Sequence, residues 1–235
     1  MNSGSKEVRM DAAAIKSFLR DIGIEREIVA LKQVEALPSG LAAYNDKNNI
    51  CYMFGEVMEE KKVFYTTLDD HVCLLGCAAT GLDPHLQKMS DGVREESRKF
   101  HVSAVNIFPD EAIQEKAERE ADILFPKFEN SSRALIMGPF GSFAEPDVLI
   151  IVCGAEQVHL LTRAYCYARG TFVRGYAGMG ACRMLLPFAF INREPTYTVS
   201  DRTWRKALKL APDELTLVTP ADKLEVMVEY LEVVK

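Results

Sequence analysis

Apolar residues recur with a helical period in several parts of the chain. The spacing predicts helices over residues 11–22, 68–82, 110–124 and 155–168. A last helix is expected after Thr219, a capping residue, because an apolar stripe begins at Leu224. The charged positions within residues 110–124 are typical of the solvated face of a surface helix.

Shorter apolar runs predict strands over residues 27–37, 50–54, 62–67, 133–137, 148–153 and 215–218. The run 148–153 is continuously apolar, which suits a strand buried on both faces. Gly154 closes it and a predicted helix follows, which makes a strand–glycine–helix unit in the C-terminal half. Strands are grouped early and alternate with helices late, so the pattern predicts an α+β fold with a mixed sheet and flanking helices.

The composition supports one full hydrophobic core. The chain has 235 residues, of which 48% are hydrophobic and 26% charged. We expect a flexible lead-in at residues 1–9 and a single α+β domain over residues 10–235. Residues 125–132 are a candidate sub-boundary, because Pro126 and a polar run interrupt the pattern there.

Charge and hydropathy exclude some classes of function. The formal net charge is -6 without a long basic run, which argues against broad nucleic-acid binding. No apolar run approaches the ~20 residues of a membrane helix, and no secretory signal is visible. A cytoplasmic protein is expected, and its six cysteines are then thiols or metal ligands rather than disulfides. General grounds alone leave a homo-oligomer open.

A glycine-rich loop is the first candidate site. Gly175, Gly178 and Gly180 match neither the dinucleotide fingerprint nor the phosphate loop of nucleotide-binding proteins. Their backbone N–H groups can still form a nest for an anion, with Arg174 and Arg183 beside it. Three interpretations stay open: a structural turn with solvated arginines, an anion or phosphate site, and a site centred on a thiol.

Cys182 directly follows the glycine loop. A thiol at the start of a helix beside Arg183 is expected to have a lowered pKa, which suits a catalytic nucleophile or a metal ligand. The alternative is a small buried hydrophobic residue, the commonest fate of a free cysteine. Further along, Asp201 and Arg202 are candidates for ligand contacts, with an ion pair or a turn cap as the alternative.

Cys73 and Cys77 lie four residues apart in a predicted helix and would share one of its faces. Two thiolates on one face can hold a metal ion or cluster, although this spacing differs from the common two-residue knuckle. Two buried cysteines on an apolar helix face are the alternative.

Several segments together resemble a known family. They are the strand at 133–139, the run 145–165, the glycine loop with Cys182, and the stretches 200–202, 213–224 and 70–82. The chain resembles an uncharacterised archaeal and bacterial family, domain of unknown function one hundred and sixty-nine, over residues 10–235. The resemblance implies no established activity.

The resemblance also implies an arrangement of cysteines. Residues like Cys73 and Cys182 belong to the family pattern, and many members carry another cysteine just before the segment matching 200–202. Here that place holds Thr198 or Val199. If the family site is a multi-cysteine metal site, this chain has lost a ligand or substitutes Cys77 or Cys51.

Three functions follow as hypotheses. The first is a site where Cys73, Cys77 and Cys182 bind zinc, another metal or an iron–sulfur cluster, or where the loop binds a small anion. The second is an enzyme that uses Cys182 on an anionic small molecule held by Arg174 or Arg183. The third is a structural or interaction protein. The sequence leaves open whether the protein is an enzyme.

Overall fold

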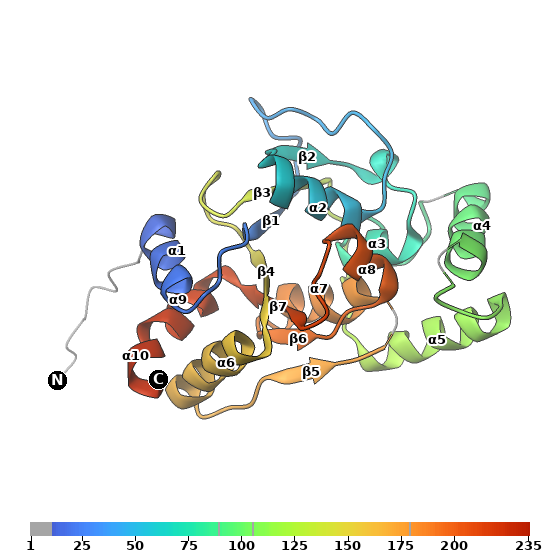
Figure 1. Ribbon diagram of the computed structural model, residues 1–235. Helices are drawn as coiled ribbons and strands as arrows, with labels where there is room; N and C mark the ends of the chain where they lie inside the picture. Colours follow the sequence, from blue (N-terminus) through green and yellow to red (C-terminus); the bar gives the residue numbers. More distant parts are fainter. Residues whose placement is uncertain (1–10, 89, 105, 179) are drawn as a thin grey trace.

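A computed structural model describes residues 11–88, 90–104, 106–178 and 180–235, so the predicted lead-in at residues 1–9 lies outside the described residues. Figure 1 shows a single sheet with helices around it. The strands, in the order β2-β3-β1-β4-β7-β6-β5, are Val29–Val34 (β1), Phe64–Thr66 (β2), Ala134–Pro139 (β3), Val148–Gly154 (β4), Arg174–Tyr176 (β5), Thr196–Thr198 (β6) and Glu214–Pro220 (β7).

The sheet is mixed, as the sequence predicts. All neighbouring strands are antiparallel except β5 and β6, which are parallel. The central strand β4 is paired on both sides, with β1 and with β7. This confirms the α+β fold with a mixed sheet.

Side chains of β4 alternate between two hydrophobic cores. Val148, Ile150 and Val152 belong to one core, with the helices α2 (Ile50–Glu60), α7 (Ala181–Ile191) and α8 (Arg202–Ala207). Leu149, Ile151 and Cys153 belong to the other, with α1 (Ala12–Asp21), α6 (Ala155–Arg169), α9 (Ala221–Glu229) and α10 (Leu231–Val234). The predicted burial of this strand on both faces is confirmed, and the strand–glycine–helix unit is β4–Gly154–α6.

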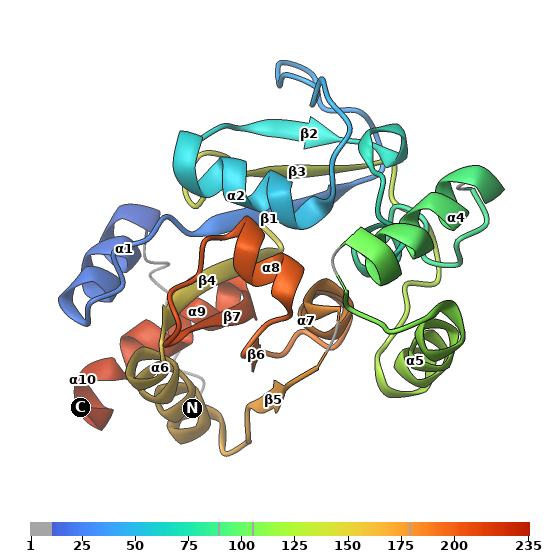
Figure 2. The same ribbon diagram turned by 45° about the vertical axis from the view of Figure 1, so that its right-hand side comes forward.

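A group of helices extends beyond the sheet. It consists of η1 (Leu68–Asp70), α3 (Leu74–Ala79), α4 (Asp91–Lys99), the π-helical segment η2 (Phe100–Ala104) and α5 (Glu111–Leu124). Figure 1 and Figure 2 both show α4 and α5 together, away from the sheet. Because α3 packs against α7, this group meets the sheet layer at the start of α7.

Residues 50–54 form a helix, so the predicted strand is wrong. Asn49 is the N-cap and α2 runs to Glu60, with buried residues on more than one side of the helix. A helix that is apolar over most of its circumference shows no clear helical period, and its short apolar run therefore resembles a strand.

The helix predicted over residues 68–82 is broken in two. Thr67 and Asp70 form a capping box around η1, and His71 is extended. As a result Cys73 is the N-cap of α3, and Cys77 lies inside that helix. The last helix begins after Pro220 rather than Thr219, which lies in β7. Within the described ranges, none of the helices has the length and apolar character needed to span a membrane.

Candidate functional site

The backbone or packing around each of the three glycines in the loop explains why glycine occupies that position. Gly180 is left-handed, with φ of 78°, and is the N-cap of α7, while Gly178 has φ of 136°. A Cβ at Gly175 would lie 2.4 Å from the ring of Tyr197, so glycine lets this ring lie against β5. Met179 of the same loop lies outside the described residues. These positions support the interpretation as a turn, and nothing in them tests anion binding.

Arg183 and Arg174, near the loop, interact with other residues of the same chain. Arg183 is buried and donates to the carbonyl of Pro126 at 3.0 Å and to Asp122 at 3.3 Å. The guanidinium of Arg174 lies 5.7 Å from the centre of the Phe188 ring, a cation–π distance. Arg202 is exposed at the first position of α8. Whether any of them also binds a ligand stays a prediction.

Asp201 joins the starts of two helices. One carboxylate oxygen accepts the backbone N–H of Trp204 at 2.9 Å and caps α8. The other accepts the backbone N–H of Ala181 at 2.6 Å, in the first turn of α7. The first amide of α7, where the sequence suggested an external anion, is therefore bound by a carboxylate of the chain itself.

Cysteines 51, 73 and 182, which we call the thiol cluster, are brought together from distant parts of the chain. Cys51 is the second residue of α2, Cys73 is the N-cap of α3, and Cys182 is the second residue of α7. The pKa of Cys182 is raised by burial, then by the neighbouring thiols of Cys73 and Cys51, and then by Asp201. The pKa of Cys51 is likewise raised by burial first and then by Cys73 and Asp201.

The starts of α2, α3 and α7, which carry the three cysteines, also pack against one another. Gly76 of α3 faces Ile50 at the start of α2, and a Cβ at Gly76 would lie 2.8 Å from that side chain. A Cβ at Gly180, the N-cap of α7, would lie 3.6 Å from Leu75 of α3. The starts of α2, α3 and α7 therefore meet.

Backbone N–H groups at the helix starts donate to the thiol cluster. The N–H groups of Leu75 and Gly76 donate to Cys73, and that of Arg183 donates to Cys182. Burial outweighs these bonds: it raises the pKa of Cys73 to about 11 and those of Cys51 and Cys182 well above their usual value. The lowered pKa expected for Cys182 is therefore wrong, because Arg183 pairs elsewhere and desolvation dominates.

His101 lies against the thiol cluster and was not selected by the sequence. Its Nε2 atom lies 3.6 Å from Cys73 Sγ, and its Nδ1 atom lies 3.3 Å from Gln114 Nε2. Gln114 in turn donates to Glu118 at 2.9 Å. Burial lowers the pKa of His101 to about 4, with a small opposite effect from Asp201. The imidazole is therefore neutral at pH 7, beside a neutral thiol.

The three cysteines of the cluster are buried, although less completely than Cys77. Cys51, Cys73 and Cys182 are 8%, 7% and 8% exposed, whereas Cys77 is 0% exposed. The pKa of Cys77 is raised by burial first and then by Cys73 and Asp83. Cys77 thus lies deeper than the three cysteines of the cluster and is close to Cys73.

The side chains of the cluster do not form a closed metal site. Among the residues that the structure describes, no group of three or more His, Cys, Asp or Glu side chains is arranged to hold a metal ion. All six cysteines of the sequence are free thiols. The cluster brings neutral thiols close to a neutral imidazole, and as they stand these side chains do not converge on one point.

The comparison with protein families covers almost the whole chain. Residues 18–230 match the family DUF169, described as “Uncharacterised ArCR”. The chain belongs to the DUF169 family. It is also similar to the uncharacterized protein MJ0308 of Methanocaldococcus jannaschii, with 25% identity over 234 residues that cover 96% of this chain and 94% of that relative. No solved structure matches the chain. The DUF169 resemblance seen in the sequence is confirmed, and it carries no activity with it.

Proposed function

We propose that the thiol cluster binds a soft metal centre, zinc or an iron–sulfur cluster, through the thiolates of Cys51, Cys73 and Cys182. His101 would supply a fourth donor. The observation that carries this proposal is the meeting of three cysteines at three helix starts, beside an imidazole that lies 3.6 Å from one of the thiols.

Electrostatics support a cation at this place. In the absence of a cation, burial and then repulsion between neighbouring thiolates disfavour ionisation of these cysteines. A bound metal ion reverses this preference, because its charge keeps coordinated sulfur deprotonated. Backbone N–H groups that donate to sulfur then stabilise the metal-bound thiolates further.

Binding requires movement of side chains. Because no three donors of the described chain converge as they stand, the cysteines would rotate about their Cα–Cβ bonds to face one ion. The cluster departs from the sequence-based set in one respect: Cys51 takes the place that Cys77 was expected to fill, since Cys77 neighbours only Cys73.

A second candidate, thiol chemistry at Cys73, is favoured by one observation. Cys73, His101 and Gln114 form a chain of contacts that resembles the order nucleophile, base and orienting group. In the part of the chain that the structure describes, His101 forms its sulfur contact with Cys73 and not with Cys182, the nucleophile expected from the sequence. The raised pKa of Cys73 favours metal binding over this candidate, because a reactive thiol needs a lowered pKa.

The test is metal stoichiometry in matched cysteine variants. Protein purified without oxygen is expected to hold zinc or iron, and Cys51→Ser, Cys73→Ser and Cys182→Ser are each expected to lose most of it. Cys166→Ser is the control, because Cys166 lies on α6, which packs against the other face of the sheet. Equal metal content in all four variants would overturn the proposal. Absence of metal combined with loss of thiol reactivity in Cys73→Ser alone would favour the second candidate.

A further inference from the structure

One segment of the chain, from Gln157 to Arg193, contains no aspartate or glutamate in its 37 residues. The whole chain has 34 acidic residues among 235, so a segment of this length would contain about five on average. It carries five arginines and no lysine. In a chain with a net charge of -6, this segment is a local concentration of positive charge.

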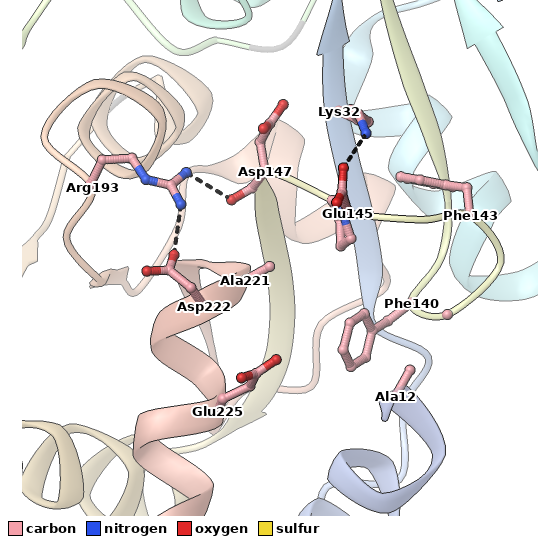
Figure 3. A pocket seen from close by; sticks show the side chains of 12 residues that line it. Ala12, Lys32, Phe140, Phe143, Glu145, Asp147, Arg193, Ala221, Asp222 and Glu225 are labelled. Carbon is pink, nitrogen blue, oxygen red and sulfur yellow. Dashed lines mark hydrogen bonds and ion pairs between the residues drawn. The ribbon is translucent and has the colours of Figure 1, made fainter. Parts of the chain in front are cut away.

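Two of the five arginines are paired within the chain. Arg183 is buried and pairs with Asp122 at 3.3 Å. Figure 3 shows Arg193 at the edge of a pocket, where it pairs with Asp222 at 2.6 Å and donates to the backbone carbonyl of Asp147 at 3.2 Å. The charges of these two arginines are therefore engaged by the fold itself.

The other three, Arg163, Arg169 and Arg174, are exposed. In the described part of the chain, none of the three forms an ion pair with a carboxylate. The guanidinium of Arg174 lies over the ring of Phe188, 5.7 Å from its centre. A guanidinium stacked on an aromatic ring is oriented by that ring and keeps its N–H edge for a carboxylate. These three arginines thus present positive charge to an outside partner.

Phe172 lies between Arg169 and Arg174 in the loop that joins α6 to β5. Its side chain is 88% exposed, the largest exposed fraction among the large apolar side chains that the structure describes. A single exposed apolar residue is common on protein surfaces. This one is flanked by arginines, and aromatic residues and arginine are the types enriched where proteins bind one another, whereas lysine is depleted there. We call Arg163, Arg169, Phe172 and Arg174 the arginine patch.

The strand that follows the patch, β5, is an edge strand. It is the last strand in the order of the sheet and pairs only with β6 among the described strands. Figure 1 and Figure 2 both show it at the lower margin of the sheet, after the end of α6. Arg174 and Gly175 of this strand are exposed. A free strand edge offers backbone N–H and C=O groups to an extended segment of another protein.

We propose that the arginine patch and the free edge of β5 bind an extended acidic segment of a partner protein. Carboxylates of that segment would pair with the three arginines, because a guanidinium binds a carboxylate through two parallel hydrogen bonds. An apolar side chain of the segment would pack on Phe172, and its backbone would lie along β5. The site shares no residue with the thiol cluster.

Charge separates this partner from the other possible ones. A second copy of the chain that met the same patch would bring arginines against arginines, which repels. Nucleic acids and anionic membranes attract proteins through larger clusters of lysine and arginine, whereas this patch has three cations on a chain of net charge -6. A short acidic protein segment matches three cations around one ring.

Fluorescence anisotropy of a labelled peptide tests this proposal. The probe is a fluorescein-labelled peptide of alternating glutamate and valine, whose valines favour an extended backbone. We expect saturable binding that added NaCl weakens, because salt screens the attraction between exposed charges. The same peptide with glutamine in place of glutamate is the uncharged control and should not bind saturably. Lack of saturable binding by the acidic peptide, or equal affinity for the glutamine peptide, would overturn the proposal.

Substitutions at exposed positions locate the site. Arg174→Gln and Phe172→Ser should each weaken binding of the acidic peptide about tenfold, as expected for residues at the centre of an interface. Arg133→Gln is the matched control and should leave the affinity unchanged, because Arg133 is exposed and directly precedes β3, near the opposite end of the sheet. Equal affinities of the three variants would overturn the proposal. Circular dichroism would confirm that each variant keeps the fold.

Two further probes decide between classes of partner. Single-stranded oligouridine and vesicles that contain phosphatidylserine should both bind more weakly than the acidic peptide. Tighter binding of either probe, lost in Arg174→Gln, would assign the patch to nucleic acid or to a membrane and overturn the proposal.

Discussion

At the scale of single residues, the position of each cysteine at a helix start matters more than its spacing in the sequence. Cys73 and Cys77 were selected together because they lie four residues apart, yet Cys73 belongs to the thiol cluster and Cys77 is fully buried inside α3. Cys51 joins the cluster because residues 50–60 form a helix rather than a strand. The cluster therefore depends on three local structures that neighbouring residues, not the cysteines, determine.

The pKa of Cys73 gives a prediction for its reactivity. In metal-free protein, a thiol with pKa of about 11 is thiolate in only about one molecule in ten thousand at pH 7. Alkylation of Cys73 by iodoacetamide should therefore be slow and rise about tenfold per pH unit between pH 7 and pH 9. Mass spectrometry of the peptide that contains Cys73 measures this rate.

A different pH profile would contradict this description of the residue. If labelling reached a plateau below pH 7, Cys73 and His101 would form a thiolate–imidazolium pair, and burial would not dominate. His101→Gln is the informative variant. It should leave the slow rate nearly unchanged if both groups are neutral, and should abolish the plateau if they form the pair.

At the scale of elements, Asp201 is the residue that ties the helix starts together. It accepts the N–H of Ala181 in α7 and the N–H of Trp204 in α8, and it is buried. Asp201→Ala removes both caps and should lower the free energy of unfolding by about 2 kcal/mol, at about 1 kcal/mol for each cap. Urea unfolding measures the change.

Asp110→Ala is the matched control for this variant. Asp110 is an exposed N-cap whose carboxylate accepts the N–H of Ile113 in α5. Its removal should cost about 1 kcal/mol. Equal costs for Asp201→Ala and Asp110→Ala would contradict the double role of Asp201. If Asp201→Ala lowers the free energy of unfolding more than Asp110→Ala does and also loses its metal, the result would support the position of Asp201 beside the thiol cluster.

The elements show what the sequence could and could not predict. The apolar run at 148–153, Gly154 and the helix after it follow from local pattern and were predicted correctly. The strands β5 and β6 have three residues each, too few for a periodic pattern, and were missed. His101 was passed over because its contacts, with Cys73 and Gln114, come from segments that only the fold brings together.

At the scale of the whole molecule, the thiol cluster lies on one face of the sheet. The helices that carry Cys51 and Cys182 pack in the core on that face, whereas α1, α6, α9 and α10 pack in the core on the other. Cys166→Ser, on α6, should therefore keep the metal that substitutions in the cluster remove.

Buried histidine makes the stability of the fold depend on pH. His71 is buried, its Nε2 lies 3.0 Å from Thr66 Oγ1, and burial lowers its pKa to about 4. The unfolded chain, with an ordinary histidine pKa near 6.5, binds the proton more readily, so acid favours unfolding. The contribution of His71 is fully present above about pH 6.5 and is lost as the pH falls towards 4.

Urea unfolding of metal-free protein at pH 7 and pH 5 measures this effect. The free energy of unfolding should fall by about 2 kcal/mol for this ring between the two values. In His71→Gln that part of the fall should disappear, whereas His85→Gln, at an exposed position, should keep it. The same pH dependence in both variants would contradict a neutral buried His71.

The central claim is that the thiol cluster binds a soft metal through sulfur. X-ray absorption at the edge of the bound metal, on protein purified without oxygen, tests it most directly. We predict a first shell dominated by sulfur, with zinc–sulfur distances of about 2.3 Å if the metal is zinc. A first shell of oxygen and nitrogen alone, or the absence of any stoichiometric metal, would contradict the claim.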